Sequence, residues 1–378
     1  MSLYNSLSLF DSFKKICEDN PQEKIVFFQD NKSFFSFTYR DIYDQSSRIA
    51  SLLRLNNIKS GDKVSVIMEN NGFWPAAFFG IIRIGAISVP LNPYQEKDEI
   101  CRLIKHSDSK LIITSAKNEQ NVKELTRGLN IPISSVDSID MSRKIPEPPE
   151  KEMFLNEKPG TDRIASIIYT SGTTASPKGA LISHKNLLSN IDSLKKLDIL
   201  KKTDCMICLL PFYHSFPFTV NMLLPLLSEV KISIPGNIDD ESIFACLKQT
   251  GVTIIVGVPR LFSSFWEEIN ENINSLWFLK RFLLNLFPKL ILKKLREKFG
   301  GRLRLMVNGG AKLSVEVSRL FHKWGIPVYE GYGLTESSPV LTFNLPSSFK
   351  PGSAGRPRKP GPTGYPRGRF PVALGLLW

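Results

Sequence analysis

Short apolar runs alternate with amphipathic stretches along the first part of the chain, and this alternation limits the folds that it can adopt. Residues 64–68 and 86–90 are predicted as strands, because each is a brief apolar run next to a turn residue. Residues 38–55 and 73–84 are predicted as helices, the first with Thr38 as its N-cap. Since strand and helix follow one another repeatedly, we expect a mostly parallel sheet covered by helices.

The same alternation begins again near residue 161, so a second α/β unit is expected. A strand at 164–169 is followed by a loop of small residues and a helix at 184–197. Further strands are predicted at 206–210, 230–234, 252–256, 303–307 and 328–329. We therefore predict one α/β subdomain over residues 1–160 and another over 161–345. Residues 144–159, rich in Pro, Glu and Lys, are predicted as an exposed connector.

The charge balance favours anionic partners but does not select one class. Lys and Arg total 49 against 36 acidic residues, an excess of 13. Nucleotides, carboxylate substrates, acidic lipids and nucleic acid all match such an excess. Nucleic acid is the least favoured of these, because the basic residues are scattered and no known reader motif occurs.

Cysteine usage and hydropathy indicate a cytoplasmic protein, either free in solution or peripheral to a membrane. Five cysteines are too few for a disulfide scaffold in a chain of 378 residues. Cys205 and Cys208 have the spacing of half a zinc site, but their apolar surroundings favour a buried strand. Neither a secretory signal nor a run of about 18 uncharged apolar residues is present, so no span of a bilayer is expected.

The segment from Tyr169 to Gly179 is the most informative stretch for chemistry. Its sequence is Tyr-Thr-Ser-Gly-Thr-Thr-Ala-Ser-Pro-Lys-Gly. Consecutive Gly, Ser and Thr let backbone N–H groups and hydroxyls converge on an anion, and Lys178 adds a positive charge. We expect this loop to bind phosphate between a strand and a helix. It differs from a Walker loop, because Lys178 is followed by Gly179 and Ala180 rather than by Ser or Thr.

This loop resembles the phosphate-binding signature of the adenylate-forming, AMP-binding superfamily, which includes acyl-CoA synthetases, luciferases and peptide-synthetase adenylation domains. Ala175 stands where Gly is common in that signature. Further motifs resemble the family's and occur in the family's order. They are Gly61-Asp62-Lys-Val, Asn70-Asn71, Gly85-Ala-Ile-Ser-Val-Pro-Leu-Asn-Pro93, Leu210-Pro-Phe-Tyr-His214-Ser, Asn308-Gly309-Gly310-Ala311, Tyr329-Glu-Gly-Tyr-Gly-Leu-Thr-Glu336 and Pro351-Gly-Ser-Ala-Gly-Arg-Pro357.

The resemblance implies an α/β fold of two helix-covered, mostly parallel sheets that form the large N-terminal domain of an adenylate-forming enzyme. A cleft is expected at the carboxyl ends of the strands, where nucleotides usually bind. The resemblance also implies ATP-dependent activation of a carboxylic acid to an acyl-adenylate and then to a thioester. ATP and Mg²⁺ would be the cofactors, and CoA or an acyl carrier protein would be the thiol acceptor.

Site residues follow from the same resemblance. Thr170, Ser171, Gly172, Thr173, Thr174 and Lys178 would hold the β- and γ-phosphates. Gly309, Gly310 and Ala311 would cover the adenine, and in the segment Glu330, Gly331, Tyr332, Gly333 the Tyr332 ring would stack on it. Thr335 would contact the α-phosphate, Glu336 would ligate Mg²⁺, and His214 would lie beside the acyl pocket. Lys178, Thr335, Glu336 and His214 form the expected catalytic set. His106, His184 and His322 are assigned only surface or packing roles.

Residues 302–314 and 325–339 are similar to long-chain acyl-CoA and acyl-carrier-protein synthetases, which points to a fatty acid substrate. Residues 276–301 contain seven Lys or Arg against one acid, Glu297, among apolar residues. They would either lie on an anionic membrane or form a packed helical insertion with a solvated cationic face. Two alternatives stay open: a ligase for another carboxylate, and a non-catalytic protein that binds nucleotide or membrane.

The composition changes abruptly near the end of the chain. Residues 351–378 contain six prolines, six glycines, five Lys or Arg and no acid. Family members continue with a ribose-binding aspartate and a mobile C-terminal domain that carries an adenylation lysine, and neither can be placed here. We interpret residues 346–378 as a truncated third, barrel-like subdomain, through frameshift or truncation. Weak or absent complete ligase activity is the expected consequence.

Overall fold

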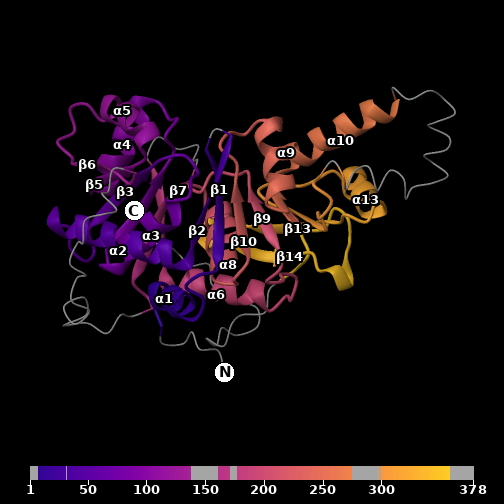
Figure 1. Cartoon of the computed structure of the whole chain (residues 1–378), viewed down its shortest axis with the longest axis horizontal. Helices are drawn as coiled ribbons and strands as arrows, with labels where there is room; N and C mark the ends of the chain where they lie inside the picture. Colours follow the sequence, from indigo (N-terminus) through magenta and orange to yellow (C-terminus); the bar gives the residue numbers. More distant parts are fainter. Residues whose placement is uncertain are drawn as a thin grey trace.

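The structure is a computed structural model that describes residues 7–30, 32–137, 161–170, 177–274, 297 and 299–357. Two sheets lie side by side in it, and helices cover both faces of each (Figure 1). The predicted α/β class with two mostly parallel sheets is therefore confirmed. The predicted connector at 144–159 lies outside the described residues.

The first sheet has six strands in the order β6-β5-β3-β4-β7-β8, and all neighbours are parallel except β7 and β8. Its strands are β3 (Lys63–Ile67), β4 (Ile87–Leu91), β5 (Ser109–Thr114), β6 (Ile133–Ser135), β7 (Ile164–Thr170) and β8 (Lys178–Ser183). Helices α4 (Lys97–Ser107) and α5 (Ala116–Leu125) cover its outer face. Alternation along β3 decides the two faces, since Val66 packs in the middle of the molecule and Ile67 packs toward α4 and α5.

The second sheet has nine strands in the order β15-β14-β13-β12-β11-β9-β10-β1-β2. Its strands are β1 (Lys24–Asp30), β2 (Ser33–Thr38), β9 (Cys205–Cys208), β10 (Lys231–Ile234), β11 (Ile254–Gly257), β12 (Leu305–Asn308), β13 (Val328–Gly333), β14 (Val340–Phe343) and β15 (Arg356–Pro357). Helices α9 (Asp240–Gln249), α10 (Pro259–Asn274) and α13 (Val315–Lys323) cover its outer face. The far N-terminal hairpin β1–β2 thus belongs to the sheet that later residues build.

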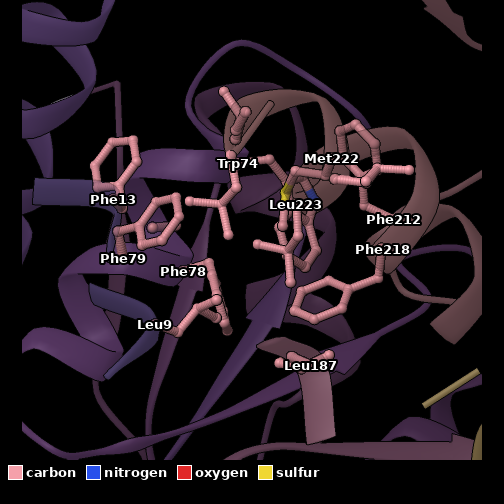
Figure 2. Packing of buried hydrophobic residues seen from close by; sticks show 14 of the residues in the cluster. Leu9, Phe13, Trp74, Phe78, Phe79, Leu187, Phe212, Phe218, Met222 and Leu223 are labelled. Carbon is pink, nitrogen blue, oxygen red and sulfur yellow. The ribbon is translucent and has the colours of Figure 1, made fainter. Parts of the chain in front are cut away.

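The layer between the sheets consists of helices from distant parts of the chain. It contains α1 (Leu9–Asp19), α2 (Tyr39–Leu55), α3 (Trp74–Arg83) and α6 (His184–Lys195), followed by the segment α7 (Ser215–Pro217), the π-helix η2 (Phe218–Leu223) and α8 (Leu224–Leu226). Aromatic rings hold this layer together, as Figure 2 shows. Phe13 stacks on Phe79 with ring centroids 3.8 Å apart, and Phe218 meets the edge of Phe78 at 4.9 Å. Helix α2 begins as predicted, because the Thr38 hydroxyl accepts a hydrogen bond from the Asp41 N–H.

One prediction about the phosphate-binding segment is wrong. The loop after β7 does not lead into a helix but into β8, an antiparallel strand in which Lys178 lies opposite Thr170. The apolar run of β8 pairs with β7, so helix α6 starts only at His184. Among the described residues that follow this loop, the first element is thus a strand and not a helix.

Two further predictions concern strands of the second sheet. β9 contains Cys205 and Cys208 as buried free thiols, which confirms the buried strand. β14 and β15 extend the sheet in the antiparallel sense, and the described strands close no barrel. The truncated third subdomain stays a prediction. Residues 358–378 lie outside the described part. The subdomain boundaries at 160 and 345 stay predictions.

Candidate active site

The carboxyl ends of the two sheets are joined by the side chain of Asn70. Asn70 follows β3 of the first sheet, and it contacts the segment after β9 of the second. Its Nδ2 donates to the carbonyl of Leu210 over 2.8 Å, and its Oδ1 accepts from the N–H of Phe212 over 2.8 Å. The segment that carries His214 is therefore held at the edge where both sheets end.

The two residues after His214, Ser215 and Phe216, contact two predicted nucleotide motifs. The Ser215 Oγ lies 2.8 Å from the Thr335 Oγ1. The Phe216 ring lies so close to Gly309 that a Cβ at that position would be 2.5 Å from the ring. Motifs about one hundred residues apart in the sequence are thus brought into contact by this short segment.

Thr335 begins a one-turn 3₁₀ helix, η3 (Thr335–Ser337), directly after β13. The turn is closed by the Ser337 N–H, which donates to the Leu334 carbonyl over 2.9 Å. Asn190 of α6 holds this turn in place, because its Nδ2 donates to the carbonyls of Ser337 (3.3 Å) and Val340 (3.2 Å). The position of the turn is thus set by buried groups outside the turn itself.

Glu336 offers a carboxylate for a metal ion. Its side chain is half-buried, and within the described part of the chain it has no hydrogen-bond or ion-pair partner. The described residues contain no group of three His, Cys, Asp or Glu side chains that could hold a metal by themselves. A hard cation such as Mg²⁺ would fit Glu336 if phosphate oxygens supplied other ligands.

Glu330 has a different setting from its neighbours in the motif. It is buried, and its two carboxylate oxygens accept the N–H groups of Leu313 (3.1 Å) and Gly352 (3.2 Å). This side chain therefore ties together the loops before α13 and before β15. Tyr332, in contrast, leaves 50% of its surface exposed, so its ring is available to a planar ligand.

Glycines at the site are required by close backbone approaches. A Cβ on Gly333 would lie 1.7 Å from the carbonyl oxygen of Pro339. Gly310 has a φ of +82°, which favours glycine. The turn over Gly309, Gly310 and Ala311 is closed by the Asn308 Nδ2, which donates to the Ala311 carbonyl over 2.9 Å.

The predicted phosphate loop is described only at its two ends. Thr170 and Lys178 face each other at the loop end of the β7–β8 hairpin, and β8 contacts η3. Ser171, Gly172, Thr173 and Thr174 lie outside the described residues.

Tyr169 anchors this hairpin on the first sheet's side. Its hydroxyl lies 2.8 Å from the Nδ1 of His106, in the last turn of α4. Burial raises the pKa of Tyr169 to about 12, so the phenol stays protonated at neutral pH.

The His214 ring is exposed at the start of α7, with the Tyr213 ring centroid 4.6 Å away. Desolvation by the surrounding protein lowers the pKa of His214 below its ordinary value. The imidazole is therefore neutral at pH 7, which suits contact with an apolar acyl group.

Ser215 and Asn190 are absent from the residues assigned by sequence. Ser215 stands next to His214 in a recognised motif, but its partner is 120 residues away. Asn190 lies within an ordinary amphipathic helix and carries no sequence signal for its long-range contacts.

The fold and this arrangement of motifs define an adenylate-forming type of domain. The family model described as AMP-binding enzyme matches residues 13–363, so the chain belongs to the AMP-binding enzyme family. Its members' common chemistry is the activation of carboxylic acids through acyl-adenylates.

By their names, the relatives of this chain act on different carboxylic acids. The chain is 26% identical to 4-coumarate–CoA ligase 3 of Arabidopsis thaliana, with 85% of this chain and 55% of that protein covered. It is 24% identical to the chloroplastic long-chain-fatty-acid–acyl-carrier-protein ligase AEE15 of the same plant, with 85% and 54% covered. The chain thus spans about half the length of these relatives.

A solved structure shows the same fold. The N-terminal domain of FACL13 from Mycobacterium tuberculosis matches with a TM-score of 0.72 at 20% identity, over 93% of this chain and 83% of that one. No helix in the described part of this chain has the length and apolar character needed to cross a membrane.

Proposed function

We propose that this chain binds ATP with Mg²⁺ and activates a carboxylic acid as its acyl-adenylate. The observation that carries the proposal is the contact of the His214–Phe216 segment with both Thr335 and Gly309. An acid held beside His214 would lie next to the turn that is expected to bind the α-phosphate. Such proximity is the main requirement when a carboxylate oxygen attacks phosphorus.

The proposed role of each site residue follows from its charge and its hydrogen-bonding groups. Lys178 and the hydroxyls of the phosphate loop balance the β- and γ-phosphates, which leave as pyrophosphate. Thr335 donates a hydrogen bond to the α-phosphate, and Glu336 holds Mg²⁺, which neutralises negative charge on the phosphates when bound. Tyr332 stacks on the adenine, beside the turn of Gly309, Gly310 and Ala311. The neutral His214 borders the acyl group.

Transfer to a thiol, CoA or an acyl carrier protein, is proposed as the second step. It is proposed for the family's complete cycle, since the chain spans about half of the relatives' length. A cytoplasmic location and peripheral contact with an anionic membrane also stay proposals. The membrane contact depends on residues 276–301, of which only Glu297 and 299–301 are described.

A long-chain fatty acid is the proposed substrate, on the similarity of residues 302–314 and 325–339 to fatty acid ligases. The relatives supply the competing class, because one acts by name on 4-coumarate and the other on long-chain fatty acids. Acid-dependent exchange of labelled pyrophosphate into ATP separates them. Saturated acids of increasing chain length and 4-coumarate are compared at equal concentration, with and without Mg²⁺.

Exchange that rises with chain length supports the fatty acid assignment, and a preference for 4-coumarate contradicts it. Glu336→Gln should reduce exchange by about 10²-fold or more, because a metal ligand is lost. Glu316→Gln, an exposed acid on α13, is the matched control and should leave exchange unchanged. ATP binding without exchange for any acid would favour the non-catalytic alternative over the proposed function.

A further inference from the structure

Two buried polar side chains that received no role from the sequence hold the Thr335 turn. Ser215, 7% exposed, approaches the Thr335 hydroxyl from α7. Asn190, 2% exposed, donates to the backbone of the same turn from α6. Both therefore act on the turn from elements that also carry other parts of the site: α6 continues from β8, and α7 follows His214.

In the contact between the Ser215 and Thr335 hydroxyls, one hydroxyl must donate its proton and the other must accept it. Each hydroxyl has one proton to donate and two lone pairs to accept. If Thr335 is to donate to an anionic phosphate oxygen, its own proton points at the ligand. The 2.8 Å contact must then be made by the Ser215 proton, with Thr335 as acceptor. A chain Ser215–Thr335–phosphate results, in which each hydrogen bond strengthens the next.

We propose that Ser215 is a positioning residue that orients the Thr335 hydroxyl toward the α-phosphate, while Asn190 fixes the backbone of the turn. The inference rests on the proposed function, because it needs a phosphate at Thr335. In the described part of the chain the Ser215 hydroxyl hydrogen-bonds to Thr335 and to no other polar group, so its effect should be confined to ligands that carry an α-phosphate. In the proposed function, the β- and γ-phosphates bind at a different element, the β7–β8 hairpin.

The test compares three ligands by isothermal titration calorimetry with the 378-residue chain: ATP with Mg²⁺, AMP and adenosine. Ser215→Ala should weaken ATP and AMP binding by a similar factor of about three to ten, the ordinary net effect of one hydrogen bond. Adenosine binding should not change. Ser215→Thr, which keeps the hydroxyl, should restore affinity, and Ser215→Cys, a weak donor, should give an intermediate value.

Ser318→Ala is the matched control. Ser318 is fully buried on α13, and its hydroxyl has no hydrogen-bond partner among the described residues. This variant removes a buried serine hydroxyl without touching the turn, so its affinities for all three ligands should match the wild type. Thr335→Val completes the test, because Ser215→Ala should have no further effect once the Thr335 hydroxyl is gone.

The outcomes separate this inference from the proposed function. If the wild type binds ATP and AMP but Ser215→Ala binds them equally well, the positioning role is wrong and the proposed function stands. An equal loss for adenosine, or an undiminished effect in the Thr335→Val background, also overturns it, because either points to a general structural defect. If the wild type binds neither ATP nor AMP, both proposals fail.

Discussion

The buried ring of His184 connects the N-terminal helix to the body of the fold. It lies at the start of α6 with 7% of its surface exposed, and its Nδ1 accepts a hydrogen bond from the backbone N–H of Leu9 over 3.4 Å. Burial lowers the pKa of His184 from 6.5 to about 4, and the nearby Arg163 acts in the same direction, whereas Asp11 opposes it. Nδ1 must be unprotonated to accept this bond, so protonation of the ring at Nδ1 would remove this contact between α1 and α6.

The sign of the pH effect follows from the two pKa values. In the unfolded chain the ring binds a proton near pH 6.5, whereas in the folded protein it does so only near pH 4. Between these values the unfolded state binds more protons, so the free energy of unfolding falls as the pH falls through this window. The two pKa values differ by about 2.5, which corresponds to a total loss of about 3 kcal/mol in the free energy of unfolding.

The assay is urea unfolding followed by circular dichroism at about pH 7.5 and about pH 4.5, for the wild type and for His184→Gln. Glutamine keeps an acceptor oxygen but does not titrate. The wild type should lose about 2–3 kcal/mol more than the variant between the two conditions. Equal losses in both proteins would refute the assignment of this pH dependence to His184.

Three further perturbations test the contacts that build the site. Asn70→Ala leaves the Leu210 carbonyl and the Phe212 N–H without their partner and should lower the free energy of unfolding by about 2 kcal/mol in urea titrations, whereas an unchanged midpoint would contradict a bridge between the sheets. Gly309→Ala forces a Cβ against the Phe216 ring, so a cost of about 1–3 kcal/mol is expected, and Phe216→Leu in the same chain should recover part of it. Glu330→Gln replaces one of the two accepting carboxylate oxygens by an amide NH₂ that faces a backbone N–H. Thermal denaturation should show a loss of about 1–3 kcal/mol in the free energy of unfolding. Full stability would mean that Glu330 does not hold the two loops together.

Local signals in the sequence were sufficient for most elements. Thr38 and the apolar spacing after it predict α2 with the observed cap, because capping and amphipathicity act within a few residues. The apolar runs of β3 and β9 likewise predict buried strands. β8 is not predicted from the sequence, because all five residues between Gly172 and Lys178 are Ser, Thr, Ala or Pro, which are typical of a loop and give no signal for the strand that follows.

The site itself could be anticipated only as a set of separate motifs. The residue types at Thr335, Glu336 and His214 indicate the chemistry, but the bond between Ser215 and Thr335 joins residues 120 positions apart. Asn190 occupies a buried helical position where an apolar residue would satisfy the pattern equally well. Such partners depend on the packing of complete sheets, which no local period in the sequence encodes.

The pairing of β1 with β10 has a consequence for synthesis on the ribosome. Val26 pairs with Ile232, so 232 − 26 = 206 residues must be added before β1 can meet β10, its second neighbour besides β2. At about 5–20 residues per second, this interval lasts about 10–40 s. During that time the β1–β2 hairpin, with the aromatic residues Phe34, Phe35 and Phe37, has an open edge next to apolar side chains. The β1–β2 hairpin is therefore open to incorrect strand pairing during synthesis, although in the finished fold β1 is an interior strand.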